Sequence, residues 1–123
     1  MHERWAIGTM TGTSLDALDA SLVHAEGRGM DLRVRVVEHR THALDTVRTR
    51  LRAACDGAAM TARDFAALAL DFGKLHADAL APLAGDRPIA VAAIHGQTVF
   101  HAPPVSWQLL NPWPIAQRLG CAV

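Results

Sequence analysis

The stretch Gly8–Ala20, GTMTGTSLDALDA, decides the fold because it places a glycine- and hydroxyl-rich loop directly after a short apolar run. The residues Trp5–Thr9 before the loop and Leu18–Ala25 after it each have the apolar pattern of a buried strand. Such a loop offers close backbone approach, free N–H groups and hydroxyls, which together suit the oxygens of a phosphate. The alternative is a hairpin turn in which the hydroxyls bond their own backbone.

Two familiar nucleotide-binding loops do not fit this stretch. A P-loop needs a lysine beside its last serine or threonine, and no lysine lies within Gly8–Ala20. A dinucleotide-binding loop opens a helix, whereas the residues after this loop have the pattern of a second strand. If the loop binds phosphate, it belongs to another class.

The composition describes one ordinary soluble domain. The 123 residues include 12 basic and 12 acidic side chains, and this balance excludes a surface built for nucleic acid or an anionic membrane. Cys55 and Cys121 form no CxxC pair, so we expect neither a disulfide framework nor a thiolate metal site. The N-terminal residues lack a signal-peptide pattern and no run approaches the ~20 apolar residues that span a bilayer, so we expect a cytoplasmic location.

The segment after the second strand alternates with period two. Leu32, Val34 and Val36 alternate with arginines, which predicts a strand whose apolar side chains face the core while the arginines face water. Together with the two strands that flank the loop, this strand completes a three-stranded antiparallel meander.

Helical spacing follows the meander. Apolar residues over Leu44–Leu51 predict a first helix, which Gly57 ends. Thr61 and Asp64 form a capping-box pattern ahead of a longer helix that ends near Pro82.

The last third of the chain returns to extended structure. The run RPIAVAAIHG, residues 87–96, predicts a strand buried on both faces and parallel to the first strand. The paired prolines predict that HAPPVS, residues 101–106, is a loop. A short extended piece over residues 107–111 then leads into a helix entered through Pro112 and Pro114.

Three strands followed by helix, strand and helix predict an α/β fold of the actin-like, RNase H-like ATPase class, in which parallel strands and flanking helices extend the meander. Residues 7–23, IGTMTGTSLDALDASLV, resemble the opening of the anhydro-N-acetylmuramic acid kinase family, and residues 92–104, AAIHGQTVFHAPP, resemble a second segment of that family. Residues 68–80 and 107–123 are also similar to their family counterparts. The resemblance covers essentially the whole chain. It implies that residues 1–123 form the N-terminal lobe of the kinase.

The resemblance implies that the first motif binds ATP, with its glycine, threonine and serine nearest the terminal phosphates. Phosphoryl transfer is mainly positioning and charge stabilisation, so backbone N–H groups and hydroxyls are what the protein must supply. Asp16 and Asp19 either hold Mg²⁺ through water or orient the loop, with a structural role as the alternative. The implied ATP-binding residues are Gly12, Thr13, Ser14, Leu15, Asp16, Ala17, Leu18 and Asp19.

His95, Gln97 and Thr98 follow a predicted parallel strand at its carboxyl end, where open α/β sheets bind ligands. Imidazole and amide groups both donate and accept hydrogen bonds, which suits sugar hydroxyls. The resemblance implies that these residues contact an amino sugar. The spacing of His95 and His101 fits no helical metal pair, so we exclude a zinc site.

The resemblance implies ATP-dependent opening of 1,6-anhydro-N-acetylmuramic acid by water, with phosphorylation of its 6-oxygen, in a homodimeric enzyme of cell-wall recycling. The family's general base is an aspartate in an Asp-Thr-Gly-Pro-Gly-Asn segment, which residues 1–123 do not contain. We therefore expect the base to lie beyond Val123, assign no catalytic residue within the chain, and expect the isolated chain to be inactive. The chain departs from the family pattern at Thr11, Ala17 and Asn111, where the family has Ser, Gly and Asp.

Two other functions stay open. One is a non-catalytic actin-like module that binds a sugar or a partner without phosphoryl transfer, which the departures at Ala17 and Asn111 favour. The other is a different sugar or acid kinase of the same superfamily. The final residues Cys121, Ala122 and Val123 have the pattern of an opening buried strand, from which we expect the chain to be the N-terminal piece of something longer.

Overall fold

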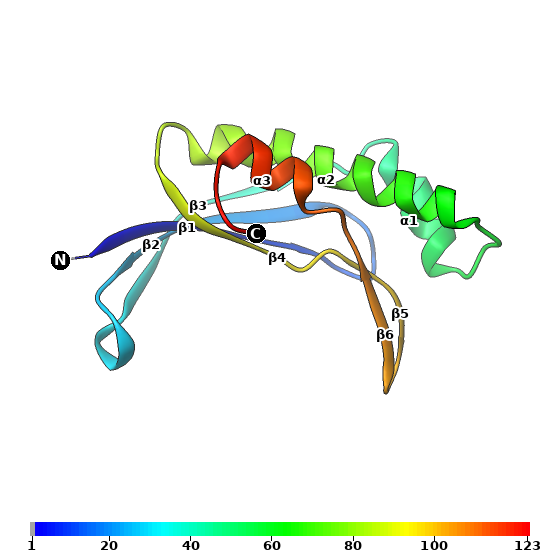
Figure 1. Cartoon of the computed structure of the whole chain (residues 1–123), viewed down its shortest axis with the longest axis horizontal. Helices are drawn as coiled ribbons and strands as arrows, with labels where there is room; N and C mark the ends of the chain where they lie inside the picture. The colour runs from blue at the N-terminus through cyan, green and yellow to red at the C-terminus, as the bar shows by residue number, and fades with distance from the viewer. Residues whose placement is uncertain (1) are drawn as a thin grey trace.

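The computed structural model describes residues 2–123 and shows a mixed sheet with the helices gathered on one of its faces (Figure 1). The first three strands pair antiparallel in sequence order, and the fourth pairs parallel with the first, which gives the order β3-β2-β1-β4. A 3₁₀ turn, η1, joins β2 to β3. The bounds are β1 Glu3–Thr11, β2 Leu18–Glu26, η1 Gly29–Asp31, β3 Arg33–His42 and β4 Ile89–Ile94.

The helices are α1 (Val47–Cys55), α2 (Ala62–Ala84) and α3 (Trp113–Leu119). The predicted capping box is confirmed at α2: the Asp64 N–H donates to the Thr61 hydroxyl at 3.1 Å, and the Thr61 N–H donates to the Asp64 carboxylate at 2.9 Å. Among residues 2–123, none of these helices combines the length and apolarity needed to cross a membrane.

The core consists of two apolar clusters on the helix-covered face of the sheet. One lies between the sheet and the C-terminal half of α2, with α3 beside it; the other lies beneath α1 and the N-terminal half of α2. Burying one such side chain contributes about 1.5–3 kcal/mol, so these clusters hold the layers together. The first includes Ile7, Leu22, Leu80, Leu83 and Ile115, and the second includes Leu15, Leu18, Leu51, Leu68 and Phe72.

A separate hairpin, β5 (Gln97–Ala102) with β6 (Val105–Leu109), projects away from the helices (Figure 1). The prediction that residues 101–106 are all loop is wrong, because His101 pairs with Ser106 within this ladder. Only the two prolines form the turn between the strands. A turn tolerates residues without an N–H, so the ladder loses nothing by having them there.

The prediction that Leu32, Val34 and Val36 face the core is wrong, because their exposed fractions are 46%, 59% and 60%. The alternation itself is present. Val36 lies opposite Val23, which lies opposite Ala6, so these side chains share the face that the helices leave uncovered. The period-two pattern identified one face of β3 but not the face on which the helices pack.

Strand β4 pairs parallel with β1, as predicted, but it is not buried on both faces. Val91 is exposed on the uncovered face, while Ala92 beside it is buried. The difference arises because helices cover only one side of the sheet.

The last residues of the chain lie against β4. Val91 forms a parallel bridge with Ala122, and the Ala92 N–H donates to the Ala122 carbonyl at 2.9 Å. Ala122 therefore starts to extend the sheet, as the pattern predicts. The prediction that this strand is buried is wrong, because Ala122 and Val123 are both exposed, Val123 at 43%. The bridge and the packing of Cys121 against the first core cluster hold this segment, while Val123 stays largely open to solvent.

Candidate functional site

The loop between β1 and β2 presents exposed Gly12, Thr13 and Ser14 at the edge of the sheet. The Leu15 N–H donates to the Gly12 carbonyl at 3.1 Å, which closes this segment into a tight turn. We refer to Gly12–Ala17 as the hydroxyl loop. Its exposed backbone N–H groups and hydroxyls are the donors that an anion needs.

Leu15 anchors the hydroxyl loop from within the core. Its side chain is fully buried among residues of α1 and α2, including Leu51 and Phe72. Its backbone has a positive φ of 55°, which costs a residue with a Cβ about 1–2 kcal/mol. Burial of the leucine side chain contributes about 1.5–3 kcal/mol, so it offsets that strain and stabilises the backbone conformation at this position.

Two arginines of α1 approach the hydroxyl loop. Arg52 Nη2 donates to the Ser14 carbonyl at 2.8 Å, and Arg48 Nη2 lies 3.7 Å from Asp16 Oδ1. Residues four apart on a helix share one face, so the two guanidinium groups are presented together. They place positive charge beside the loop's hydroxyls, where phosphate oxygens would be attracted. Sequence reasoning missed both arginines, although their spacing on a predicted helix was a usable signal.

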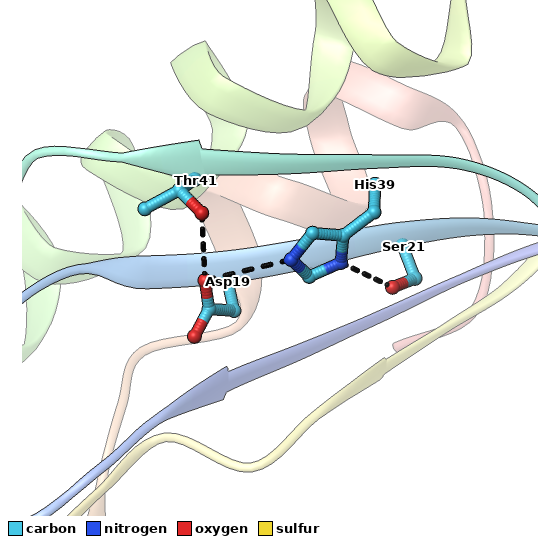
Figure 2. A network of polar contacts seen from close by, with 4 residues as sticks. All are labelled: Asp19, Ser21, His39 and Thr41. Atoms are coloured by element: carbon cyan, nitrogen blue, oxygen red, sulfur yellow. Dashed lines mark hydrogen bonds and ion pairs between the residues drawn. The ribbon is translucent and has the colours of Figure 1, made fainter.

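Asp19 lies just beyond the loop, on the face of the sheet away from the helices. Thr41 Oγ1 donates to its Oδ1 at 2.9 Å, and His39 Nε2 is 3.6 Å from the same oxygen (Figure 2). The carboxylates of Asp16 and Asp19 are both exposed, and oxygen ligands of this kind fit Mg²⁺ bound through water. No local sequence signal marks His39 or Thr41, since their places depend on the β2–β3 register.

The second sequence motif meets the first at the same sheet edge. The Thr11 hydroxyl donates to the Gly96 carbonyl at 3.0 Å, although the two residues are 85 positions apart. The parallel pairing of β1 with β4 explains this, because the carboxyl ends of parallel neighbours lie side by side. His95 is exposed there, with Nδ1 lying 3.0 Å from the Gly96 carbonyl oxygen.

Gln97 points into the protein, with an exposed fraction of 1%. Its Nε2 donates to the Thr98 carbonyl at 3.3 Å and to Cys55 Sγ at 3.9 Å, and burial raises the pKa of that thiol. Gln97 Oε1 has no hydrogen-bond partner among residues 2–123. Thr98 is half-buried, and its hydroxyl accepts from Gln108 Nε2 at 3.4 Å. Of the three predicted sugar contacts, His95 is therefore the one that is openly exposed.

Two further groups of side chains lie away from the hydroxyl loop. Exposed Trp107 packs against Phe65 with the rings tilted by 46° and 4.9 Å between their centroids, and it lines an apolar hollow of about 590 Å³ between α2 and β6. Glu3, His24 and Glu26 are the one group within residues 2–123 whose ligand atoms lie close enough together for a metal ion. They lie at the opposite end of β1 and β2 from the hydroxyl loop.

Comparison with known proteins shows the family to which the chain belongs. A family model described as anhydro-N-acetylmuramic acid kinase matches residues 4–123. The chain belongs to the anhydro-N-acetylmuramic acid kinase family. Three proteins named anhydro-N-acetylmuramic acid kinase are similar to this chain. The one from Synechocystis sp. is 34% identical over 94% of the chain. Those from Rhodospirillum rubrum and Caldanaerobacter subterraneus are 36% and 34% identical, each over 97% of the chain. The chain spans about a third of these relatives' length, at 33%, 32% and 34%.

Two of the three positions that depart from the expected family pattern, Thr11 and Asn111, form hydrogen bonds of their own. Thr11 keeps the hydroxyl of the family's serine and uses it to bind Gly96. Asn111 Oδ1 accepts a hydrogen bond from the Trp113 N–H at 3.0 Å, at the start of α3, which a carboxylate oxygen would also do. Ala17 is half-buried where the family has glycine, and nothing in the structure explains that change.

Proposed function

We propose that the chain forms the nucleotide-phosphate-binding lobe of an actin-like kinase that acts on 1,6-anhydro-N-acetylmuramic acid. The observation that carries the proposal is the hydroxyl loop: exposed Gly12–Ser14, anchored from within by Leu15 and tethered from the side by Arg52. The sheet order β3-β2-β1-β4, with this loop between the first two strands, supports the actin-like assignment. Membership of the kinase family supports ATP as the phosphoryl donor.

The hydroxyl loop would bind the outer phosphates through the backbone N–H groups and hydroxyls of Gly12–Ser14. Donors that are fixed before the phosphate arrives stabilise the developing charge without reorganising. Arg48 and Arg52 add positive charge on the α1 side of the loop. Asp16, whose carboxylate lies beside Arg48, and Asp19 would hold Mg²⁺ through water, and that ion, when bound, supplies charge neutralisation on the outer phosphates.

The sugar would bind beside this loop, at the segment His95–Thr98. His95 is exposed at the carboxyl end of β4, and the Thr11–Gly96 hydrogen bond fixes this segment against the end of β1. Gln97 would act from inside by holding the Thr98 carbonyl, since its amide is buried. The proposed reaction opens the anhydro ring with water and phosphorylates the 6-oxygen. We further propose a cytoplasmic role in cell-wall recycling and a homodimeric assembly.

We expect the 123-residue chain to bind nucleotide without transferring phosphate. The relatives are about three times as long, and the aspartate segment that supplies the general base is not among residues 1–123. The base is thus expected beyond Val123, in the part of the family that this chain does not cover. A sugar- or partner-binding module without catalysis is the second candidate. The two candidates differ in whether the longer family context adds phosphoryl transfer.

Calorimetric titration with MgATP, MgADP and adenosine tests the proposal. We expect binding of the two phosphorylated ligands and none of adenosine. Gly12→Val should abolish binding, because a Cβ there meets nothing closer than Ser14 Oγ at 3.9 Å and the larger side chain fills the space meant for phosphate. Ala90→Val adds bulk at an exposed position at the far end of β4 and serves as the control. Absence of nucleotide binding by the unmodified chain contradicts the proposal.

A further inference from the structure

Four polar side chains form one connected network on the uncovered face of the sheet (Figure 2). Asp19 and Ser21 come from β2, and His39 and Thr41 come from β3 directly opposite, in the pairs Asp19–Thr41 and Ser21–His39. His39 Nδ1 lies 2.9 Å from Ser21 Oγ, and its Nε2 lies 3.6 Å from Asp19 Oδ1. The imidazole therefore spans diagonally from one residue of β2 to the next residue on the same face.

The hydrogen-bond chemistry of this network leaves half of the Asp19 carboxylate free. When the Ser21 hydroxyl donates to Nδ1 of His39, the ring proton resides on Nε2 and is directed toward Asp19. The Thr41 hydroxyl donates to the same carboxylate oxygen at 2.9 Å. Thr41 Oγ1 and His39 Nε2 both approach Oδ1, while Oδ2 points away from them in Figure 2 and has no partner among residues 2–123.

A hollow on the same face of the sheet lies beside Asp19. The hollow has a volume of about 360 Å³, and Asp19, Ser21 and His39 form part of its lining. Gly8 forms another part, and a Cβ placed there would meet nothing closer than 4.0 Å, so no side chain fills the space above it. Asp19 pairs with Met10, one residue before the last pair of the β1–β2 ladder, so the carboxylate is close to both ends of the loop.

We propose that His39 is a positioning residue that orients Asp19 toward the hydrated metal ion of a bound nucleotide. The inference rests on the proposed function, because it assumes that phosphates occupy the hydroxyl loop. A carboxylate that contacts metal-bound water is effective only when its rotation is restricted, and partners of this kind change metal affinity by about 10–100-fold when removed. Asp19 is exposed, so we expect an effect at the low end of that range.

The experiment measures the affinity of the full 123-residue chain for MgATP and for ATP in EDTA. The ratio of these two affinities is the metal preference of each variant. His39→Phe removes both ring nitrogens, whereas His39→Gln keeps an N–H near the position of Nε2. Asp19→Asn defines the effect of losing the carboxylate itself. His101→Phe is the matched control, because His101 also bonds a serine hydroxyl, Ser106 at 3.1 Å, but pairs with no carboxylate among residues 2–123.

We expect His39→Phe to weaken MgATP binding about tenfold while metal-free ATP binding stays within about twofold. His39→Gln should recover most of the loss, and His101→Phe should behave as the unmodified chain. A merely structural histidine would lower the thermal midpoint and both affinities together, and that result overturns the inference. It is also overturned if Asp19→Asn loses the metal preference while His39→Phe keeps it. If the unmodified chain binds neither form of ATP, the proposed function fails first and the inference falls with it.

Discussion

Replacing Arg52 tests whether α1 contributes to phosphate binding. Its Nη2 donates to the Ser14 carbonyl at 2.8 Å, and a charge-assisted hydrogen bond of this kind stabilises by about 1.5–3 kcal/mol when shielded from solvent. Arg52 is exposed, so we reduce this tether to about 1 kcal/mol. A phosphate charge about 6 Å from the guanidinium adds about 0.7 kcal/mol in water. The sum corresponds to a change of more than tenfold in nucleotide affinity.

Two substitutions separate the tether from the charge. Arg52→Gln removes both and should weaken MgATP binding by about tenfold or more, whereas Arg52→Lys keeps the charge and should lose about fivefold. Calorimetric titration at low and moderate salt should show a smaller salt dependence for Arg52→Gln, because salt screens only the charge contribution. Arg63→Gln is the control, since Arg63 is exposed in the first turn of α2 and forms no ion pair among residues 2–123.

Two outcomes would refute this reasoning about Arg52. One is that Arg52→Gln binds MgATP as tightly as the unmodified chain, with the same salt dependence. The other is that Arg63→Gln loses as much affinity as Arg52→Gln, since the effect would then come from net charge and not from the position of Arg52.

Three further predictions concern the framework that holds the site. Leu15→Ala should lower the free energy of unfolding in urea by about 2–4 kcal/mol, because the side chain is fully buried, and a loss below about 1 kcal/mol would contradict its anchoring role. Gly73→Ala gains about 1 kcal/mol of helix propensity, but its Cβ would lie 2.2 Å from the Asn111 carbonyl oxygen. The resulting strain of about 3 kcal/mol should win, so an increased urea midpoint would refute the close packing of α2 on the segment before α3. Burial lowers the pKa of His76 from 6.5 to about 4, so the unfolded chain takes up a proton at a higher pH than the folded chain does. The free energy of unfolding should therefore be at its full value above pH 6.5. Between pH 6.5 and pH 4 it should fall by up to about 1.4 kcal/mol per pH unit. His76→Gln should show a shallower fall in urea midpoints over that range, and an identical fall would contradict the assignment.

Features that depend on neighbouring residues could be predicted from the sequence. The strands flanking the hydroxyl loop and the capping box at Thr61 follow from local pattern. The parallel pairing of β4 with β1 joins distant segments, and the sequence indicates it because a continuously apolar run is typical of strands in parallel sheets. The covered face of β3 could not be predicted, because alternation gives two equivalent faces. Only the docking of α1, α2 and α3 on one side determines that Val36 is exposed.

The same difference between local features and features set by distant elements applies to the candidate site. The hydroxyl loop could be identified from composition, because glycine and hydroxyl residues cluster within a few positions. Arg52 and His39 reach the site from other elements, and a register shift between Leu22 and Val23 alters which β3 residues lie opposite β2. Gln97 is the opposite case, because its residue type suits sugar binding but its side chain is buried. The sequence pattern does not indicate whether this side chain is directed inward or outward.

The most direct test of phosphate binding by the hydroxyl loop is a backbone amide NMR titration of the 13.2 kDa chain. The ¹H–¹⁵N signals of Gly12, Thr13 and Ser14 should move in a saturable manner with MgATP and remain still with adenosine, because the main-chain N–H groups bind the outer phosphates. If those three amides remain unchanged while MgATP saturates signals elsewhere, or if nothing in the spectrum responds, the loop is not a phosphate site.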